Sequence, residues 1–90
     1  MSYRRVRIIP GAAARFTRKW YKGLGPQAVM PKEAREYSIK ISELEGKVFD
    51  VGREYDERIV LRYPPELVET TKDGKKVVAI DLEKDLVEKV

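Results

Sequence analysis

Residues 47–63 read KVFDVGREYDERIVLRY, and this stretch decides the predicted fold. Within residues 47–53 and again within residues 58–63, large apolar side chains recur at alternate positions, which is the period-two pattern of a strand buried on one face. These apolar residues are Phe49, Val51, Ile59, Leu61 and Tyr63. The charged residues 54–57 separate the two runs, so we expect two neighbouring strands joined by a short turn.

Four other segments predict further short strands, at residues 3–9, 37–41, 66–71 and 76–80. An Asp73-Gly74 dipeptide between the last two is typical of a β-hairpin with a type I′ turn. Gly52 predicts a bulge or bend within its strand. The expected fold class is α+β, with a small curved antiparallel sheet or a partly open SH3- or OB-like barrel of four to five strands.

Two helices are predicted, one near each end of the chain. In residues 12–22 three alanines favour a helix, and apolar side chains recur at every fourth position. In residues 82–90 apolar side chains have the same spacing, and Asp81 precedes them as an N-cap. The two apolar stripes consist of Phe16, Trp20 and Leu24, and of Leu82, Leu86 and Val90.

The charges are distributed unevenly along the chain. The first forty residues hold ten basic and two acidic residues, a net charge of +8, whereas the remaining fifty hold nine basic and thirteen acidic residues, a net charge of −4. We therefore predict a basic N-terminal arm at residues 1–36, formed by a strand, an amphipathic helix and a loop over residues 25–33. Residues 37–90 would form a small β-rich body with a C-terminal helix.

The composition argues against several classes of chemistry. The chain has no Cys and no His, so it lacks the strongest nucleophile, the usual general base and the common zinc ligands. We expect a non-enzymatic protein with no catalytic residue, no metal and no cofactor. No apolar run approaches the length of a membrane span, so we expect a cytoplasmic protein. The absence of Asn and the abundance of charged residues suggest a thermophilic source.

The basic arm is the strongest candidate for a functional site. Clusters of Lys and Arg bind the phosphates of nucleic acids and release counterions, and aromatic side chains among them can stack on unpaired bases. Tyr21 lies off the apolar stripe of the predicted helix, so it is a better stacking candidate than Trp20, which we expect to anchor the core. The predicted nucleic-acid-binding residues are Arg4, Arg5, Arg7, Arg15, Arg18, Lys19, Tyr21, Lys22, Lys32 and Arg35.

A long basic arm interrupted by Pro and Gly, joined to a small acidic β-rich body, resembles the general build of archaeal and eukaryotic-type ribosomal proteins. The resemblance covers the style of residues 4–40 and no family motif. It implies a structural ribonucleoprotein component whose arm neutralises phosphates of ribosomal RNA and whose neighbours include other ribosomal proteins.

Three alternatives remain open at this point, and the last of them is a scaffold or virion subunit with no nucleic-acid role. The first is a DNA-binding, chromatin-type protein of a thermophile, although such proteins usually spread basic charge over the sheet rather than over an arm. The second is a protein- or membrane-interaction module that inserts the apolar stripe of the amphipathic helix at Ala12 to Lys22.

Overall fold

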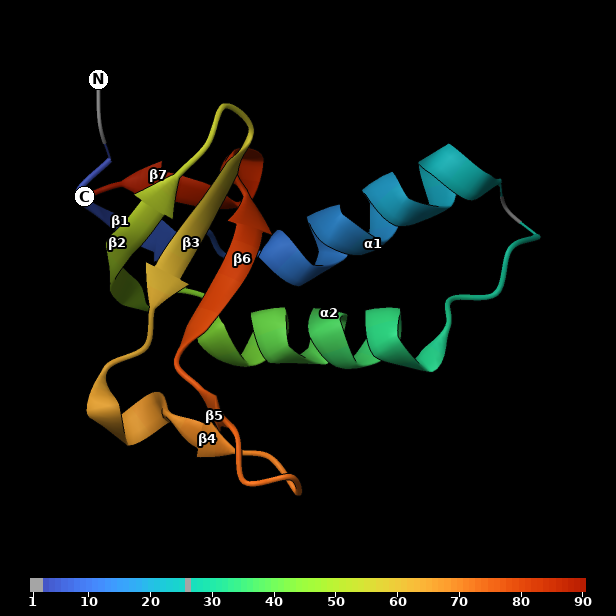
Figure 1. Ribbon diagram of the computed structural model, residues 1–90. Helices are drawn as coiled ribbons and strands as arrows, with labels where there is room; N and C mark the ends of the chain where they lie inside the picture. Colours follow the sequence, from blue (N-terminus) through green and yellow to red (C-terminus); the bar gives the residue numbers. More distant parts are fainter. Residues whose placement is uncertain (1–2, 26) are drawn as a thin grey trace.

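The computed structural model describes residues 3–25 and 27–90 (Figure 1). Pro26, within the predicted loop, and the first two residues of the predicted arm lie outside this part. Strands and helices follow in the order β1 (Arg5–Ile8), α1 (Ala12–Leu24), α2 (Lys32–Leu44), β2 (Val48–Glu54), β3 (Arg58–Arg62), β4 (Glu69–Thr70), β5 (Lys76–Val77), β6 (Ala79–Glu83) and β7 (Val87–Lys89). Two short 3₁₀ turns, η1 (Pro65–Leu67) and η2 (Lys84–Leu86), precede β4 and β7.

The main sheet is antiparallel and has the strand order β6-β3-β2-β1-β7. β6 and β7 form opposite edges of this sheet, yet only the three residues of η2 separate them in the sequence. The sheet must therefore curl strongly, as Figure 1 shows. The predicted curved antiparallel sheet is confirmed, and its two edge strands do not pair, so the sheet is open rather than closed into a barrel.

The alternating stretch that decided the prediction forms β2 and β3. Ile59, Leu61 and Tyr63 are buried as the pattern predicts. The register between β2 and β3 shifts between Val51 and Arg53, which places a bulge at Gly52 and confirms that prediction. Because a bulge adds one residue to one strand, it increases the local twist and helps the sheet to curl.

A single hydrophobic core joins the beginning, middle and end of the chain. Val6 and Ile8 of β1 pack in the same cluster as Ile41 of α2 and Leu86 of η2. β1 is an inner strand of the sheet, between β2 and β7. The boundary that we predicted after residue 36 falls within α2.

The strand predicted at residues 37–41 is wrong, because this segment belongs to α2. The period-two interpretation required Ile39 to face the core together with Ile41, but Ile39 is 59% exposed whereas Ile41 is fully buried. The buried or half-buried side chains are instead Tyr37, Ile41 and Leu44, at the i, i+4 and i+7 positions of a helix. Residues 32–36 are mostly good helix formers and could have indicated this.

The predicted C-terminal helix is also wrong. Residues 79–83 form the edge strand β6, in which Ile80 and Leu82 face the core and pair with Leu61 and Ile59 of β3. β3 offers a free edge whose backbone groups need partners, and this favours a strand over a helix. Asp81 is consequently no helix cap, and its carboxylate accepts a hydrogen bond from Arg58 Nε at 2.9 Å.

The hairpin predicted at Asp73-Gly74 forms, although its strands β4 and β5 are shorter than expected. Gly74 has a φ of +81°, while no non-glycine residue in the described part of the chain has a positive φ, so Asp73 does not adopt the conformation of a type I′ turn. The Gly74 N–H donates to the Thr71 carbonyl at 2.9 Å, and Thr71 N–H donates to the Lys75 carbonyl at 2.8 Å. This is a type I turn followed by a left-handed glycine.

The helices α1 and α2 run side by side and project from one end of the sheet (Figure 1). Phe16 contacts Tyr37 edge to face at 5.0 Å between ring centroids, and the Thr17 and Ser38 hydroxyls are 3.2 Å apart. At the base of the pair, Glu45 accepts hydrogen bonds from the N–H groups of Gly11 and Ala13 at 2.7 and 3.1 Å. A carboxylate at a helix N-terminus is favourable, so the end of α2 stabilises the beginning of α1.

We predict that two neighbouring isoleucines of α2 differ sharply in their effect on stability. Ile41→Ala should lower the free energy of unfolding by about 2–5 kcal/mol, because it leaves a cavity in the core. Ile39→Ala removes the same atoms from an exposed position and should change it by at most about 0.5 kcal/mol. Urea unfolding followed by circular dichroism measures both values, and equal losses would contradict the helical assignment of this segment.

Candidate nucleic-acid interface

Three basic residues form an exposed stripe on α1. Arg15, Arg18 and Lys22 follow at i, i+3 and i+7, so they lie on one face of the helix. Phe16 and Thr17, which contact α2, point away from this face. We call Arg15, Arg18 and Lys22 the cationic stripe. Within the part of the chain that the structure describes, none of the three forms an ion pair with an acidic residue.

Lys19, which we had grouped with these residues, is held on the side of α1 that faces the sheet edge. Its ammonium group pairs with Glu83 of β6 and, at 2.8 Å, with Asp85 of η2. The hydrogen bonds to Asp85 and then to Glu83 raise the pKa of Lys19 above its ordinary value, whereas desolvation acts in the opposite direction. Both carboxylates neutralise its charge, so Lys19 positions α1 rather than extending the stripe.

Arg15 combines an exposed charge with a structural contact. Its Nη1 atom donates a hydrogen bond to the backbone carbonyl of Asp85 at 3.0 Å. This contact leaves the guanidinium charge without a carboxylate partner of its own. Together with Lys19 it ties α1 to η2, so the cationic stripe lies on a helix with a fixed orientation relative to the sheet.

The other predicted residues divide into paired and unpaired groups. Arg5 pairs with Asp50 at 3.4 Å, Arg7 with Glu88 at 3.1 Å and Lys32 with Glu36 at 3.8 Å. Arg4 and Arg35 are exposed and, among residues 3–25 and 27–90, have no ion-pair partner. The structure therefore does not bring the ten predicted residues together as one surface. Arg4, Arg5 and Arg7 lie at β1, and the remaining seven lie on the two helices.

The aromatic residues of α1 are only partly available. Tyr21 is half-buried, and its ring meets the Trp20 ring edge to face at 5.1 Å between centroids. Trp20 is half-buried as well and lies outside the hydrophobic core, so the prediction that it anchors the core is wrong. The core contact of α1 comes from Ala12, Ala13 and Phe16.

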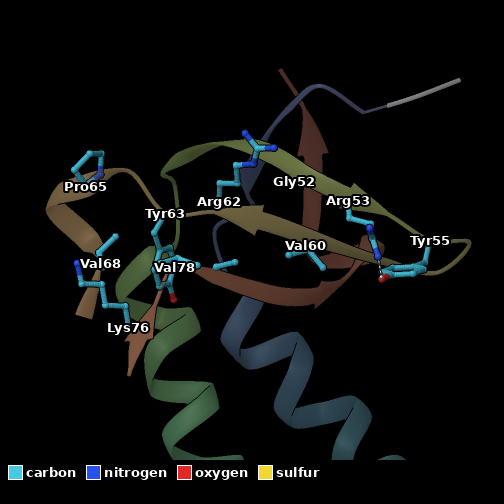
Figure 2. Close-up of a pocket in the computed structure, with 11 residues that line it drawn as sticks. Gly52, Arg53, Tyr55, Val60, Arg62, Tyr63, Pro65, Val68, Lys76 and Val78 are labelled. Carbon is cyan, nitrogen blue, oxygen red and sulfur yellow. Dashed lines mark hydrogen bonds between the residues drawn. The ribbon is translucent and has the colours of Figure 1, made fainter. Parts of the chain in front are cut away.

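A second basic region, which the sequence did not predict as a site, is a groove of about 750 Å³ at the sheet (Figure 2). Its basic residues come from three strands or their ends, Arg53 from β2, Arg62 from β3 and Lys76 from β5. The strand pairing brings them together, so their spacing in the sequence gives no signal. Arg58, four residues before Arg62 in β3, is instead paired with Asp81.

The described residues give no sign of metal chemistry or of a membrane span. Among residues 3–25 and 27–90, no three Asp, Glu, His or Cys side chains are grouped so that they could hold a metal ion. No helix within the same residues is long and apolar enough to cross a bilayer.

Comparisons of the chain with models of protein families, with curated proteins and with solved structures found no match. The class that the fold defines is α+β, with an open antiparallel sheet and a projecting pair of helices. The function proposed below rests on the charge, exposure and spacing of the chain's own residues.

We predict that Lys19 reacts slowly with an amine-acetylating reagent near pH 9 and that its two acidic partners cause this. The raised pKa keeps more of the amine protonated, and only the neutral amine reacts. The double variant Glu83→Gln/Asp85→Asn should accelerate acetylation of Lys19 severalfold, as measured by peptide mass spectrometry. Lys22 serves as the internal control, and its rate should stay the same. An unchanged rate at Lys19 would contradict the paired arrangement.

Proposed function

We propose that the protein is a non-enzymatic RNA-binding protein that neutralises RNA phosphates with the cationic stripe Arg15, Arg18 and Lys22. The observation that carries the proposal is the absence of acidic partners for this stripe within the described residues, although the flanking Lys19 has two. An ion pair presents little net charge to an approaching polyanion. The unpaired cations of α1 therefore dominate the field on this side of the molecule.

The geometry of the stripe suits a phosphate backbone. Lys22 lies seven positions after Arg15, so the three charges extend along about 10 Å of helix. Like charges at this spacing repel one another and do not stabilise the helix by themselves. Bound phosphates would remove this repulsion, and the released counterions would contribute to the free energy of binding.

We favour RNA over duplex DNA because the net positive charge is concentrated in the first forty residues, which carry +8, while residues 41–90 carry a net charge of −4. A chromatin-type protein, the alternative, would spread basic charge over its sheet. The finer fold that we infer is a partly open barrel of the SH3 or OB type. OB folds bind oligonucleotides, which is an analogy at the level of fold alone.

The alternative of a membrane- or protein-docking helix has less support. Docking would use the apolar stripe of α1, but Phe16 in this stripe is already packed against Tyr37 and the core. Leu24, at the end of α1, is exposed. One exposed leucine offers little apolar area for insertion into a bilayer or a groove.

We further propose that the protein works in the cytoplasm as a component of the ribosome or of another ribonucleoprotein particle. The native protein should then sediment with such particles from a cell extract, and treatment with RNase should release it. Sedimentation as a free small protein would contradict this part of the proposal without affecting RNA binding itself.

We predict that the triple variant Arg15→Gln/Arg18→Gln/Lys22→Gln binds RNA more weakly and with a lower salt dependence. Each lost phosphate contact should reduce the magnitude of the slope of log Kobs against log salt by about 1, so the slope should change by about 3. Fluorescence anisotropy with a labelled RNA hairpin at several salt concentrations measures it. A parallel titration with duplex DNA of equal length tests the preference for RNA.

The matched control is the triple variant Arg5→Gln/Arg7→Gln/Lys32→Gln. It removes the same formal charge from residues that are already paired, so its slope should remain close to that of the wild type. Because Arg15 also contacts η2, the double variant Arg18→Gln/Lys22→Gln provides a second test without that contact. If the stripe and control variants lose equal affinity, binding depends on net charge and the proposed interface is wrong.

A further inference from the structure

The groove in Figure 2 has a chemical character that the cationic stripe lacks. Its basic lining residues are Arg53, Arg62 and Lys76, and no acidic side chain lines it. None of these three residues forms an ion pair within residues 3–25 and 27–90, and Arg53 has only a long 3.5 Å hydrogen bond to the Tyr55 hydroxyl. Three unneutralised cations around one groove favour an anionic occupant.

The rest of the groove is apolar and partly aromatic. Val60, Val68 and Val78 line it together with Tyr55 and Tyr63. Val78 is 54% exposed and Tyr55 is 50% exposed, so these side chains are open to a partner. Tyr63 is almost fully buried and contributes a wall that packs against Phe49, with 6.3 Å between ring centroids. The preferred occupant therefore has apolar, flat surfaces as well as negative charge.

Gly52 shapes the groove by allowing Arg62 to lie across the neighbouring strand. A Cβ atom at Gly52 would come within 3.1 Å of Arg62 Cγ and 3.5 Å of the Val60 carbonyl oxygen. Because Gly52, at the bulge, has no Cβ atom, the aliphatic part of the Arg62 side chain fits beside it. Arg62 is exposed, and within residues 3–25 and 27–90 its guanidinium group forms no ion pair with a carboxylate.

From these features we infer that the groove binds a short stretch of unpaired RNA nucleotides, with Tyr55 stacking on a base and Arg53, Arg62 and Lys76 contacting phosphates. Stacking on an exposed aromatic ring is tolerant of sequence, and cations that follow the backbone supply the electrostatic part of binding. The volume lies in the range of ligand sites and exceeds what a single inorganic anion needs. This inference rests on the proposed function and adds a second RNA contact at a different surface.

Three variants test the groove in different ways. Tyr55→Ala removes the stacking ring and should weaken binding of a labelled single-stranded octauridylate about tenfold. Arg53→Gln/Arg62→Gln removes two phosphate contacts and should reduce the magnitude of the salt slope for the single-stranded octauridylate by about 1.4. Gly52→Val changes no charge but displaces Arg62, and it should also weaken binding. Anisotropy measures all three, and thermal unfolding verifies that each variant folds.

The matched control is Lys72→Gln/Lys75→Gln, which removes two cations from the β4–β5 hairpin outside the groove. It should leave octauridylate binding close to the wild-type value. In addition, an octauridylate containing 4-thiouridine should crosslink to Tyr55 or a neighbouring groove residue on irradiation. Peptide mass spectrometry identifies the site, and a crosslink only on α1 would overturn the inference.

The proposed RNA contacts at the stripe and at the groove can be tested separately. Loss of hairpin binding in the stripe variant with octauridylate binding retained supports the groove and the stripe as distinct sites. Octauridylate binding that is insensitive to all groove variants overturns the groove alone, whereas hairpin binding that is insensitive to the stripe variant overturns the proposed function. Equal affinity for free uridine monophosphate, or complete displacement of octauridylate by an equal concentration of oligoglutamate, would also overturn the assignment to unpaired RNA.

Discussion

The rest of the structure depends on the position of β1 inside the sheet. This strand pairs with β2 on one side and with β7 on the other, so it joins the first residues of the chain to the last. Val6 and Ile8 are fully buried there, and the N–H groups of Gly46 and Ile9 donate to the carbonyls of Ile8 and Leu86 at 2.7 and 3.0 Å. Without β1 the strand order would be interrupted between β2 and β7, and the core would lose two fully buried side chains.

The position of β1 in the sheet also determines where the basic helix α1 begins. α1 begins four positions after the last residue of β1, and its first residue, Ala12, is fully buried. Lys19 and Arg15 then hold the helix against β6 and η2. Exposed ion pairs contribute little to stability, typically about 0–1 kcal/mol each. Their larger effect here is to neutralise some basic side chains and leave others unpaired. Which side chains remain unpaired depends on the fold rather than on the net charge.

The sequence was sufficient where one local pattern had one interpretation. The alternation at Ile59, Leu61 and Tyr63, the alanines that begin α1 and the glycine at the bulge all led to elements that the structure contains. It was insufficient where two patterns overlapped. Residues 37–44 contain apolar positions that fit both a strand and a helix, and the exposure of Ile39 shows that the helix is correct.

The C-terminal error has a different cause. Leu82 and Leu86 are both buried, as a helix would require, but they belong to a strand and to the following turn. The free edges of β3 and β1 determine this outcome, because β6 and β7 pair with them as strands. The local sequence does not indicate that these edges need partners.

For the site, the sequence identified Arg15, Arg18 and Lys22 but grouped Lys19 with them, because its partners Glu83 and Asp85 are more than sixty residues away. The groove was missed because Arg53, Arg62 and Lys76 belong to three different strands, and only the strand pairing brings them together.

Under the two proposals, the fold explains why one small domain would carry two RNA contacts of different chemistry. The stripe on α1 offers charge, which suits the phosphates of a duplex, whereas the groove adds an exposed tyrosine and an apolar lining, which suit unpaired bases. Lys19 and Arg15 tie the helix of the stripe to β6 and η2, and the space at Gly52 leaves room for the stem of Arg62, so the two surfaces have a defined position relative to each other. Once one surface is occupied, the second contact is intramolecular and its effective concentration depends on the distance between the surfaces. A rigid spacing therefore favours RNAs in which a duplex and an unpaired segment lie at a matching separation, and this selects a structure rather than a sequence.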